Sequence, residues 1–116
     1  MDQDRLRRAA DDFRTVVQEH PGSDYAEDAR QRLIFLRNEM ARHELEVAAF
    51  DFERSAYPAA INRIDYMLDH FDGANVMDEG LVLQIRAYER LGMDDRAEEA
   101  RRVLAANWPD HPEAES

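Results

Sequence analysis

Residues 24–54 read DYAEDARQRLIFLRNEMARHELEVAAFDFER, and this run contains neither glycine nor proline. A run of this length can form one continuous helix of roughly 45 Å, because each helical residue adds about 1.5 Å. The sequence therefore predicts a single long helix here, and the packing of that helix decides the fold.

The long helix carries two apolar stripes. The first stripe consists of Ala29, Leu33, Leu36, Met40, Val47 and Phe50, and the second of Ile34, Ala41, Leu45, Ala48 and Phe52. A surface helix of a globular protein usually has only one such stripe. Two stripes about 100° apart predict neighbours on two sides, as in stacked helical hairpins.

Glycine, proline and capping residues divide the rest of the chain into four shorter helices, predicted over residues 4–19, 57–71, 77–91 and 94–107. Ser23 is the expected N-cap of the long helix, Pro58 falls in the first turn of the next helix, and Gly92 ends the fourth. The apolar spacing predicts a core made of Phe13, Val16, Leu33, Leu36, Leu45, Ala48, Ala60, Ile64, Leu68, Leu81, Ile85, Tyr88 and Leu104.

Three of the shorter helices share an internal repeat. Residues recur at spacings of 4, 3 and 5 in the sets Ala9-Phe13-Val16-Pro21, Ala60-Ile64-Met67-Asp72 and Ala97-Arg101-Leu104-Pro109. A small residue, Ser55 or Gly92, precedes each of the later two sets. The pattern resembles the second helix of a tetratricopeptide repeat (TPR), although Asp72 and Arg101 depart from it. We therefore predict an all-α fold of about five helices in TPR-like stacked hairpins, with the long helix bridging two repeats.

The charge of the chain limits its partners. Asp and Glu number 26 against 15 Lys and Arg, which gives a formal net charge of −11. This balance argues against nucleic acid, because binding to phosphates needs an excess of basic side chains. The absence of cysteine excludes disulfides and thiolate chemistry.

The sequence offers no pattern typical of an enzyme. His43-Glu-Leu-Glu differs from the metalloprotease motif, because Val47 stands where that motif needs its second histidine. There is no glycine-rich phosphate loop, and no serine lies in a nucleophile-elbow context. We therefore expect no catalytic residue, no metal site and no cofactor.

Four longer blocks carry a family resemblance: residues 13–29 (FRTVVQEHPGSDYAEDA), 32–38 (RLIFLRN), 57–64 (YPAAINRI) and 87–92 (AYERLG). With them the chain resembles, over about residues 4–107, the C-terminal half of the BamD (ComL/YfiO) family. Members of this family are outer-membrane lipoproteins of the β-barrel assembly machinery, with five TPRs and a lipid anchor on an N-terminal cysteine. We therefore expect residues 1–109 to be the C-terminal TPR-like domain of a larger protein, with Met1 as an artificial start and the lipid anchor outside this chain. Residues 110–116 are expected to form a frayed acidic tail.

The resemblance also implies a function. It implies a non-catalytic scaffold at the periplasmic face of the Gram-negative outer membrane, which contacts the POTRA domains of BamA and small lipoproteins such as BamC and BamE. The repeat pattern alone leaves an alternative open, a general TPR adaptor that binds an extended or helical peptide in its groove.

Arg63 is the sharpest candidate site residue. It shares a helix face with Ala59, Tyr66 and His70, beside Asn62. The resemblance implies that Arg63 binds the last POTRA domain, where an arginine fork can hold a carboxylate in bidentate geometry. The residues alone leave other readings open. Arg63 could be solvated or could pair within the chain with Asp65, Asp69 or a glutamate of the long helix. Asn62 could serve helix packing, and Tyr66 could be a half-buried surface residue.

Overall fold

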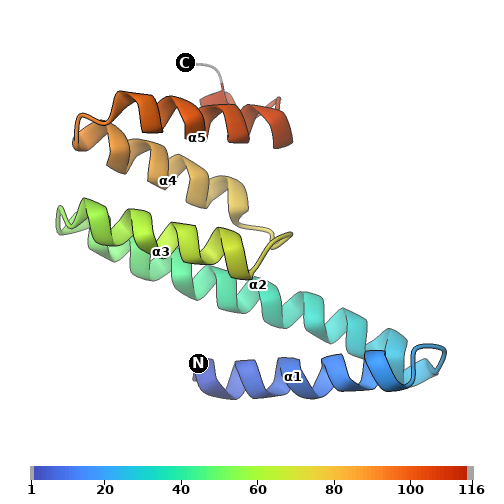
Figure 1. Ribbon diagram of the computed structural model, residues 1–116. Helices are drawn as coiled ribbons and strands as arrows, with labels where there is room; N and C mark the ends of the chain where they lie inside the picture. The colour runs from blue at the N-terminus through green and yellow to red at the C-terminus, as the bar shows by residue number, and fades with distance from the viewer. Residues whose placement is uncertain (1, 115–116) are drawn as a thin grey trace. The chain divides into compact units, whose positions relative to one another are not determined.

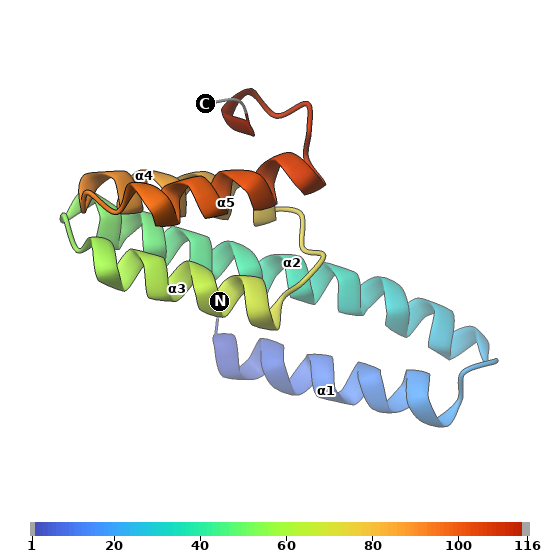
Figure 2. The ribbon, with the colours of Figure 1, turned by 45° about the horizontal axis from the view of Figure 1, so that its top comes forward.

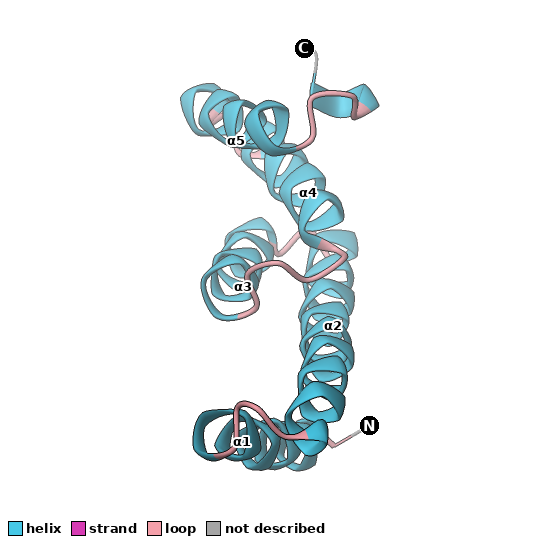
Figure 3. Ribbon diagram, turned by 90° about the vertical axis from the view of Figure 1, so that its right-hand side faces the viewer, coloured by secondary structure: helices cyan, strands magenta, loops and turns pink. Residues whose placement is uncertain are grey.

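The computed structural model describes residues 2–114, and within this range it contains five α-helices, one short 3-10 helix and no strand (Figures 1 and 3). The elements are α1 (Gln3–Glu19), α2 (Asp24–Glu53), α3 (Tyr57–His70), α4 (Met77–Arg90), α5 (Asp94–Asn107) and η1 (Pro112–Ala114). Each helix begins and ends within one residue of its predicted position. The prediction of an all-α, TPR-like fold is confirmed.

The chain forms two compact units, residues 1–40 and 41–116, and α2 contributes to both. In the first unit, α1 runs antiparallel to the beginning of α2 (Figure 1). Ser23 caps α2 as predicted, because its Oγ accepts a hydrogen bond of 3.1 Å from the backbone N–H of Ala26. The buried apolar residues of this unit are Leu6, Ala10, Ala26, Ala29, Leu36 and Met40.

The second unit is a stack of antiparallel helices. α4 runs antiparallel to α3, and α5 runs antiparallel to α4 (Figure 1). α4 and the end of α2 lie on one side of the unit, and α3 and α5 lie on the other (Figure 3). Its first hydrophobic cluster contains Ala41, Ala48, Ala60, Ile64, Met67, Ala74, Val76 and Met77. Its second cluster contains Leu81, Ile85, Ala97, Ala100 and Leu104.

The internal repeat is visible in the way α2 and α4 end. Ser55 and Gly92 follow these helices in the left-handed conformation, with φ of 62° and 74°. The next residues, Ala56 and Met93, donate their N–H groups to carbonyls five residues back, at 2.8 and 2.9 Å. Both helices therefore end in the same Schellman motif, which explains the small residue at this position of the repeat.

The second helices of the repeats also end alike. In each case the residue after the helix donates its backbone N–H to the carbonyl four residues earlier. The pairs are His20 to Val16 at 2.9 Å, Phe71 to Met67 at 3.0 Å and Trp108 to Leu104 at 2.7 Å. The repeat inferred from sequence spacing is therefore a repeat of backbone geometry.

The predicted core is correct in part. Leu36, Ala48, Ala60, Ile64, Leu81, Ile85 and Leu104 are buried. Phe13, Val16, Leu33, Leu45, Leu68 and Tyr88 are only half-buried. Ile34 and Phe50 lie on the predicted stripes, yet these residues are 44% and 60% exposed. Helix periodicity shows which residues share a face, but it does not show whether a neighbour covers that face.

The C-terminal segment folds back beside α5 (Figure 2). Ala114 packs against the second cluster, and Glu113 forms an ion pair of 3.1 Å with Arg86 of α4. The fraying expected for residues 110–116 stays a prediction for residues 110–114. Residues 115–116 of that tail, and the expected artificial start Met1, lie outside the described residues.

We expect Ala60→Leu to lower the free energy of unfolding by about 1–3 kcal/mol, because added methylenes overpack a filled contact. Ala60 is 1% exposed within the first cluster. Urea denaturation measures the change. Ala59→Leu is the matched control, because Ala59 is exposed on the same helix, and it should change stability by less than about 0.5 kcal/mol. Equal stability of the two variants would contradict the close contact at Ala60.

Candidate functional site

The residues predicted to bind a partner lie on the outer face of α3. Ala59, Arg63, Tyr66 and His70 follow one another at intervals of three or four residues, and Asn62 lies beside them. All five are exposed. The structure therefore brings the predicted residues together on one face, and the binding of a partner there stays a prediction.

Arg63 forms an ion pair across the α2–α3 contact. Its Nη1 donates to Oε2 of Glu44 on α2 at 3.0 Å. The Glu44 side chain is only 10% exposed, whereas the Arg63 side chain is 43% exposed. Of the readings left open by the sequence, a pair with a glutamate of the long helix is the one present. Arg63 is therefore a half-exposed residue of α3 whose guanidinium binds a buried carboxylate of α2.

Neither of the two aspartates considered as partners, Asp65 and Asp69, forms the ion pair seen for Arg63. Oδ1 of Asp65 accepts a hydrogen bond of 2.7 Å from Nε2 of the buried Gln84 on α4. The same Nε2 lies 3.3 Å from the carbonyl oxygen of Ile61. Asp65 therefore ties α3 to α4, while Asp69 is exposed.

Two rings stack beside Arg63 on the outer face of α3. The ring centroids of Tyr66 and His70 are 4.0 Å apart with an interplanar angle of 20°. Nδ1 of His70 lies 3.0 Å from the carbonyl oxygen of Tyr66, and Phe71 meets the Tyr66 ring edge-on at 5.9 Å. Tyr66 remains 38% exposed. The face thus combines one half-exposed cation with a flat aromatic surface.

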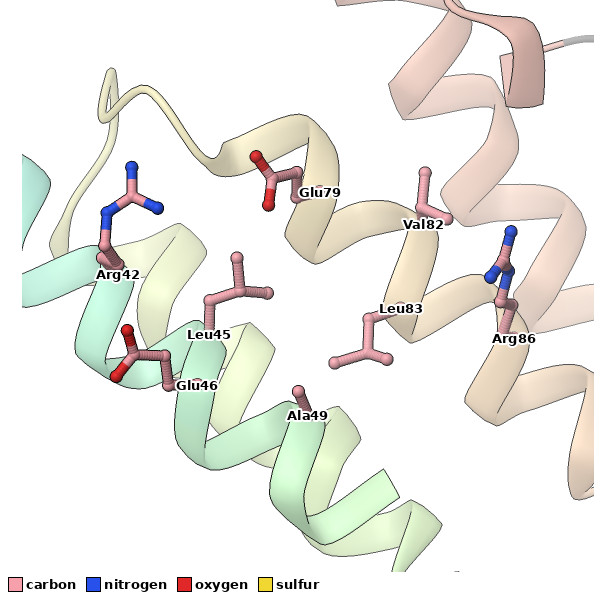
Figure 4. Close-up of a pocket in the computed structure, with 8 residues that line it drawn as sticks. All are labelled: Arg42, Leu45, Glu46, Ala49, Glu79, Val82, Leu83 and Arg86. Atoms are coloured by element: carbon pink, nitrogen blue, oxygen red, sulfur yellow. The ribbon is translucent and has the colours of Figure 1, made fainter. Parts of the chain in front are cut away.

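A second feature of this unit is a groove between α2 and α4, with a volume of about 380 Å³ (Figure 4). Its apolar lining comes from Leu45 and Ala49 of α2 and from Val82 and Leu83 of α4. Leu83 points toward Ala49 from the opposite helix in the close-up view. Sequence reasoning placed Leu45 in the core and did not identify this groove.

Charged side chains of both signs border the groove. Arg42 and Glu46 lie on the α2 side, and Glu79 and Arg86 lie on the α4 side (Figure 4). Arg86 is paired with Glu113 of η1. An apolar floor with a charged rim is typical of surfaces that bind another chain.

Arg90 of α4 contacts side chains of α2 and α3. Its guanidinium lies over the rings of Phe52 and Tyr57, at 5.4 and 5.9 Å from their centroids, and donates to the Tyr57 hydroxyl at 2.9 Å. The hydrogen bond with Ser55, together with that from Arg90, lowers the pKa of Tyr57. At α4, burial raises the pKa of the Tyr88 hydroxyl. These shifts belong to helix packing and not to the α3 face.

Among residues 2–114, no group of three or more His, Asp or Glu side chains is arranged to hold a metal ion. None of the helices in the same range is both long and apolar enough to cross a membrane.

Sequence reasoning did not single out Glu44, although a signal for it was present. Glu44 lies three residues after Ala41 and four before Ala48, both of which belong to the second apolar stripe and are fully buried. A carboxylate on a buried stripe needs a charged or hydrogen-bonding partner. That partner is Arg63.

Comparison with known proteins gives a consistent result. The model of the YfiO family, described as "Outer membrane lipoprotein", matches residues 1–104. The chain is 35% identical over 102 residues to "Outer membrane protein assembly factor BamD" of Haemophilus influenzae, covering 88% of this chain and 39% of that protein. It is 33% identical over 106 residues to the protein of the same name from Vibrio cholerae, covering 91% of this chain and 44% of that protein.

A third relative has the same name and comes from Xylella fastidiosa strain 9a5c. It is 35% identical over 106 residues, which cover 91% of this chain and 36% of the relative. The chain thus spans about two fifths of the length of the curated relatives that it matches.

Proposed function

The chain belongs to the YfiO (BamD) family of outer membrane lipoproteins, and from this membership we propose that it is a non-catalytic scaffold of outer-membrane protein assembly. The observation that carries the proposal is the similarity, over 88–91% of the chain, to relatives named as assembly factors. In this proposal the whole protein is a lipoprotein that acts at the periplasmic face of the outer membrane.

We further propose that the outer face of α3 binds a POTRA domain of BamA. The Arg63 side chain is 43% exposed on a chain whose formal net charge is −11. An acidic partner is therefore attracted to this local positive charge and not to the chain as a whole. Arginine holds a carboxylate with two parallel N–H bonds, which a lysine cannot do. The stacked Tyr66 and His70 offer flat surface beside it, and tyrosine is frequent at interface centres. Asn62 and Ala59 complete the proposed surface, and lipoproteins of the BamC and BamE type are further proposed partners.

The POTRA proposal is tested with the double variant Arg63→Gln, Glu44→Gln. Replacing both members keeps their hydrogen-bonding capacity and avoids a buried carboxylate without a partner. We expect the dissociation constant for the POTRA domain, measured by isothermal titration calorimetry at physiological salt, to rise at least tenfold, or about 1.4 kcal/mol. Arg42→Gln is the control, because Arg42 is an exposed arginine on the groove side of α2. Unchanged affinity in the double variant would refute the assignment of Arg63.

The α2–α4 groove supports a second candidate function, a TPR adaptor for a peptide. Its apolar floor and its rim of both signs suit an amphipathic helix or an extended segment. The same titrations separate the two candidates. Binding that is weakened by Arg42→Gln and by Val82→Glu, but not by the double glutamine variant, would favour the groove.

A further inference from the structure

We propose that Glu44 is a positioning residue for Arg63. Its carboxylate holds one end of the guanidinium, so that the rest faces outward from α3 toward a carboxylate of the partner. This inference rests on the proposed function for the identity of the partner, and it adds a residue from α2 to a site otherwise confined to α3.

The two side chains of the pair differ in burial, so one of them is held inside the protein and the other reaches the surface. Glu44 is anchored on α2 between Ala41 and Ala48, which are both fully buried, and its own side chain is 10% exposed. Glu44 therefore cannot follow Arg63 into solvent. The Arg63 side chain is 43% exposed, and its Nη1 is fixed 3.0 Å from Glu44 Oε2. The Glu44 side chain is thus the buried member of the pair, and the Arg63 side chain is the one that reaches the surface.

The chemistry of the guanidinium leaves a free edge. Arginine carries five N–H donors in a rigid plane, and one of its terminal nitrogens is used here. Within residues 2–114, the only ion pair of Arg63 is the one with Glu44. The N–H groups of Nε and Nη2 are not used in the pair with Glu44, and in our proposal they donate to a second carboxylate in bidentate geometry. A lysine at this position would have no such second edge.

Two effects of Glu44 on partner binding oppose each other. Its charge weakens the attraction between Arg63 and a partner carboxylate, and it also fixes a long side chain before the partner arrives. Attraction between exposed charges contributes little in water. Immobilising a rotamer-rich side chain at an interface carries a cost comparable to that attraction or larger. We therefore take positioning to be the dominant effect, so that loss of Glu44 weakens binding.

The first test needs no partner. The order parameter of the Arg63 Nε–Hε group is measured by ¹⁵N relaxation in the wild type, Glu44→Ala, Glu44→Gln and Glu46→Ala. We expect a clear fall in Glu44→Ala only, since glutamine keeps an acceptor and Glu46 is exposed on the same helix and lines the groove. Circular dichroism confirms that each variant is folded. An order parameter that does not change in Glu44→Ala would overturn the proposal.

The second test measures affinity for the POTRA domain. Glu44→Ala should raise the dissociation constant about fivefold, Glu44→Gln by less than twofold, and Arg63→Lys as much as the double glutamine variant. If Glu44→Ala binds as tightly as the wild type or more tightly, Glu44 does not position Arg63 for binding and the inference is wrong. If the wild type itself does not bind, the proposed function fails, and the order parameter alone decides whether Glu44 holds Arg63.

Discussion

We expect Met67→Ala to lower the free energy of unfolding by about 2–5 kcal/mol, the usual cost of truncating a fully buried methionine. Met67 is completely buried in the first hydrophobic cluster, where it packs between α3 and α4. Its terminal Cε fills the space above Gly80 of α4, so a cavity would open at the centre of this helix contact. Urea unfolding monitored by circular dichroism measures the loss.

The opposite change at the same contact should also destabilise the protein. A Cβ at Gly80 would collide with Met67 Cε and would lie 3.5 and 3.6 Å from two methyl carbons of Ile64. Gly80→Leu should therefore cost about 1–3 kcal/mol through overpacking, although leucine favours the helix. Gly22→Leu is the control, because a Cβ added at Gly22 meets no atom within 4 Å.

The two changes should compensate when they are combined. In the double variant Met67→Ala, Gly80→Leu, the new leucine occupies the space that the methionine has left. Substitutions in direct contact are not additive, so the double variant should lose clearly less stability than the sum of the single losses. Strict additivity would show that Met67 and Gly80 do not share this space.

The second large effect is expected for Arg63→Glu, which should destabilise the fold by about 2–4 kcal/mol. The variant removes the cation that pairs with Glu44 and places another carboxylate beside a side chain that is only 10% exposed. Breaking a buried ion pair costs about 3–5 kcal/mol, and the partial exposure of Arg63 reduces this figure. Differential scanning calorimetry and urea unfolding report the change.

Two further variants decide the cause of that loss. Adding Glu44→Gln to Arg63→Glu should restore most of the stability, because only one charge then remains at the contact. Arg86→Glu reverses an arginine whose partner Glu113 is 48% exposed, so it should cost less than about 1 kcal/mol. If Arg63→Glu is no worse than Arg86→Glu, the Glu44–Arg63 pair does not contribute to folding. We therefore expect charge reversal at Arg63 to destabilise the fold as well as to weaken the proposed binding.

The local parts of the fold could be predicted from sequence because their causes are local. Ser23 caps α2 with its own side chain, and Gly92 ends α4 with a positive φ. Burial in loops was less predictable. The break at residues 72–76 contains Ala74 and Val76, which are 5% and 0% exposed, although no helix period identifies them. Both belong to the first hydrophobic cluster, which also contains residues of α2 and α3, so their burial depends on how these helices pack.

The candidate site was predictable only on one helix. Periodicity placed Arg63, Tyr66 and His70 on the same face of α3, because that depends on 3.6 residues per turn alone. The partner of Arg63 lies 19 residues earlier on another helix, so its identity depends on how α2 and α3 are packed. The sequence offers Asp65, Asp69 and several glutamates of the long helix, and only the position of Glu44 on an apolar stripe distinguishes one of them. In the folded protein Asp65 accepts a hydrogen bond from the buried Gln84, and Arg63 pairs with Glu44.

Trp108 is the single tryptophan of the chain and packs against both hydrophobic clusters of the second unit. Its indole emission is therefore a built-in optical probe of the junction between the clusters. Unfolding of either cluster moves the ring into water and shifts the emission to longer wavelength. If the clusters melt together, the emission and the far-ultraviolet dichroism follow a single coincident transition. A fluorescence change that precedes the loss of helix would show instead that the junction opens before the helices unwind.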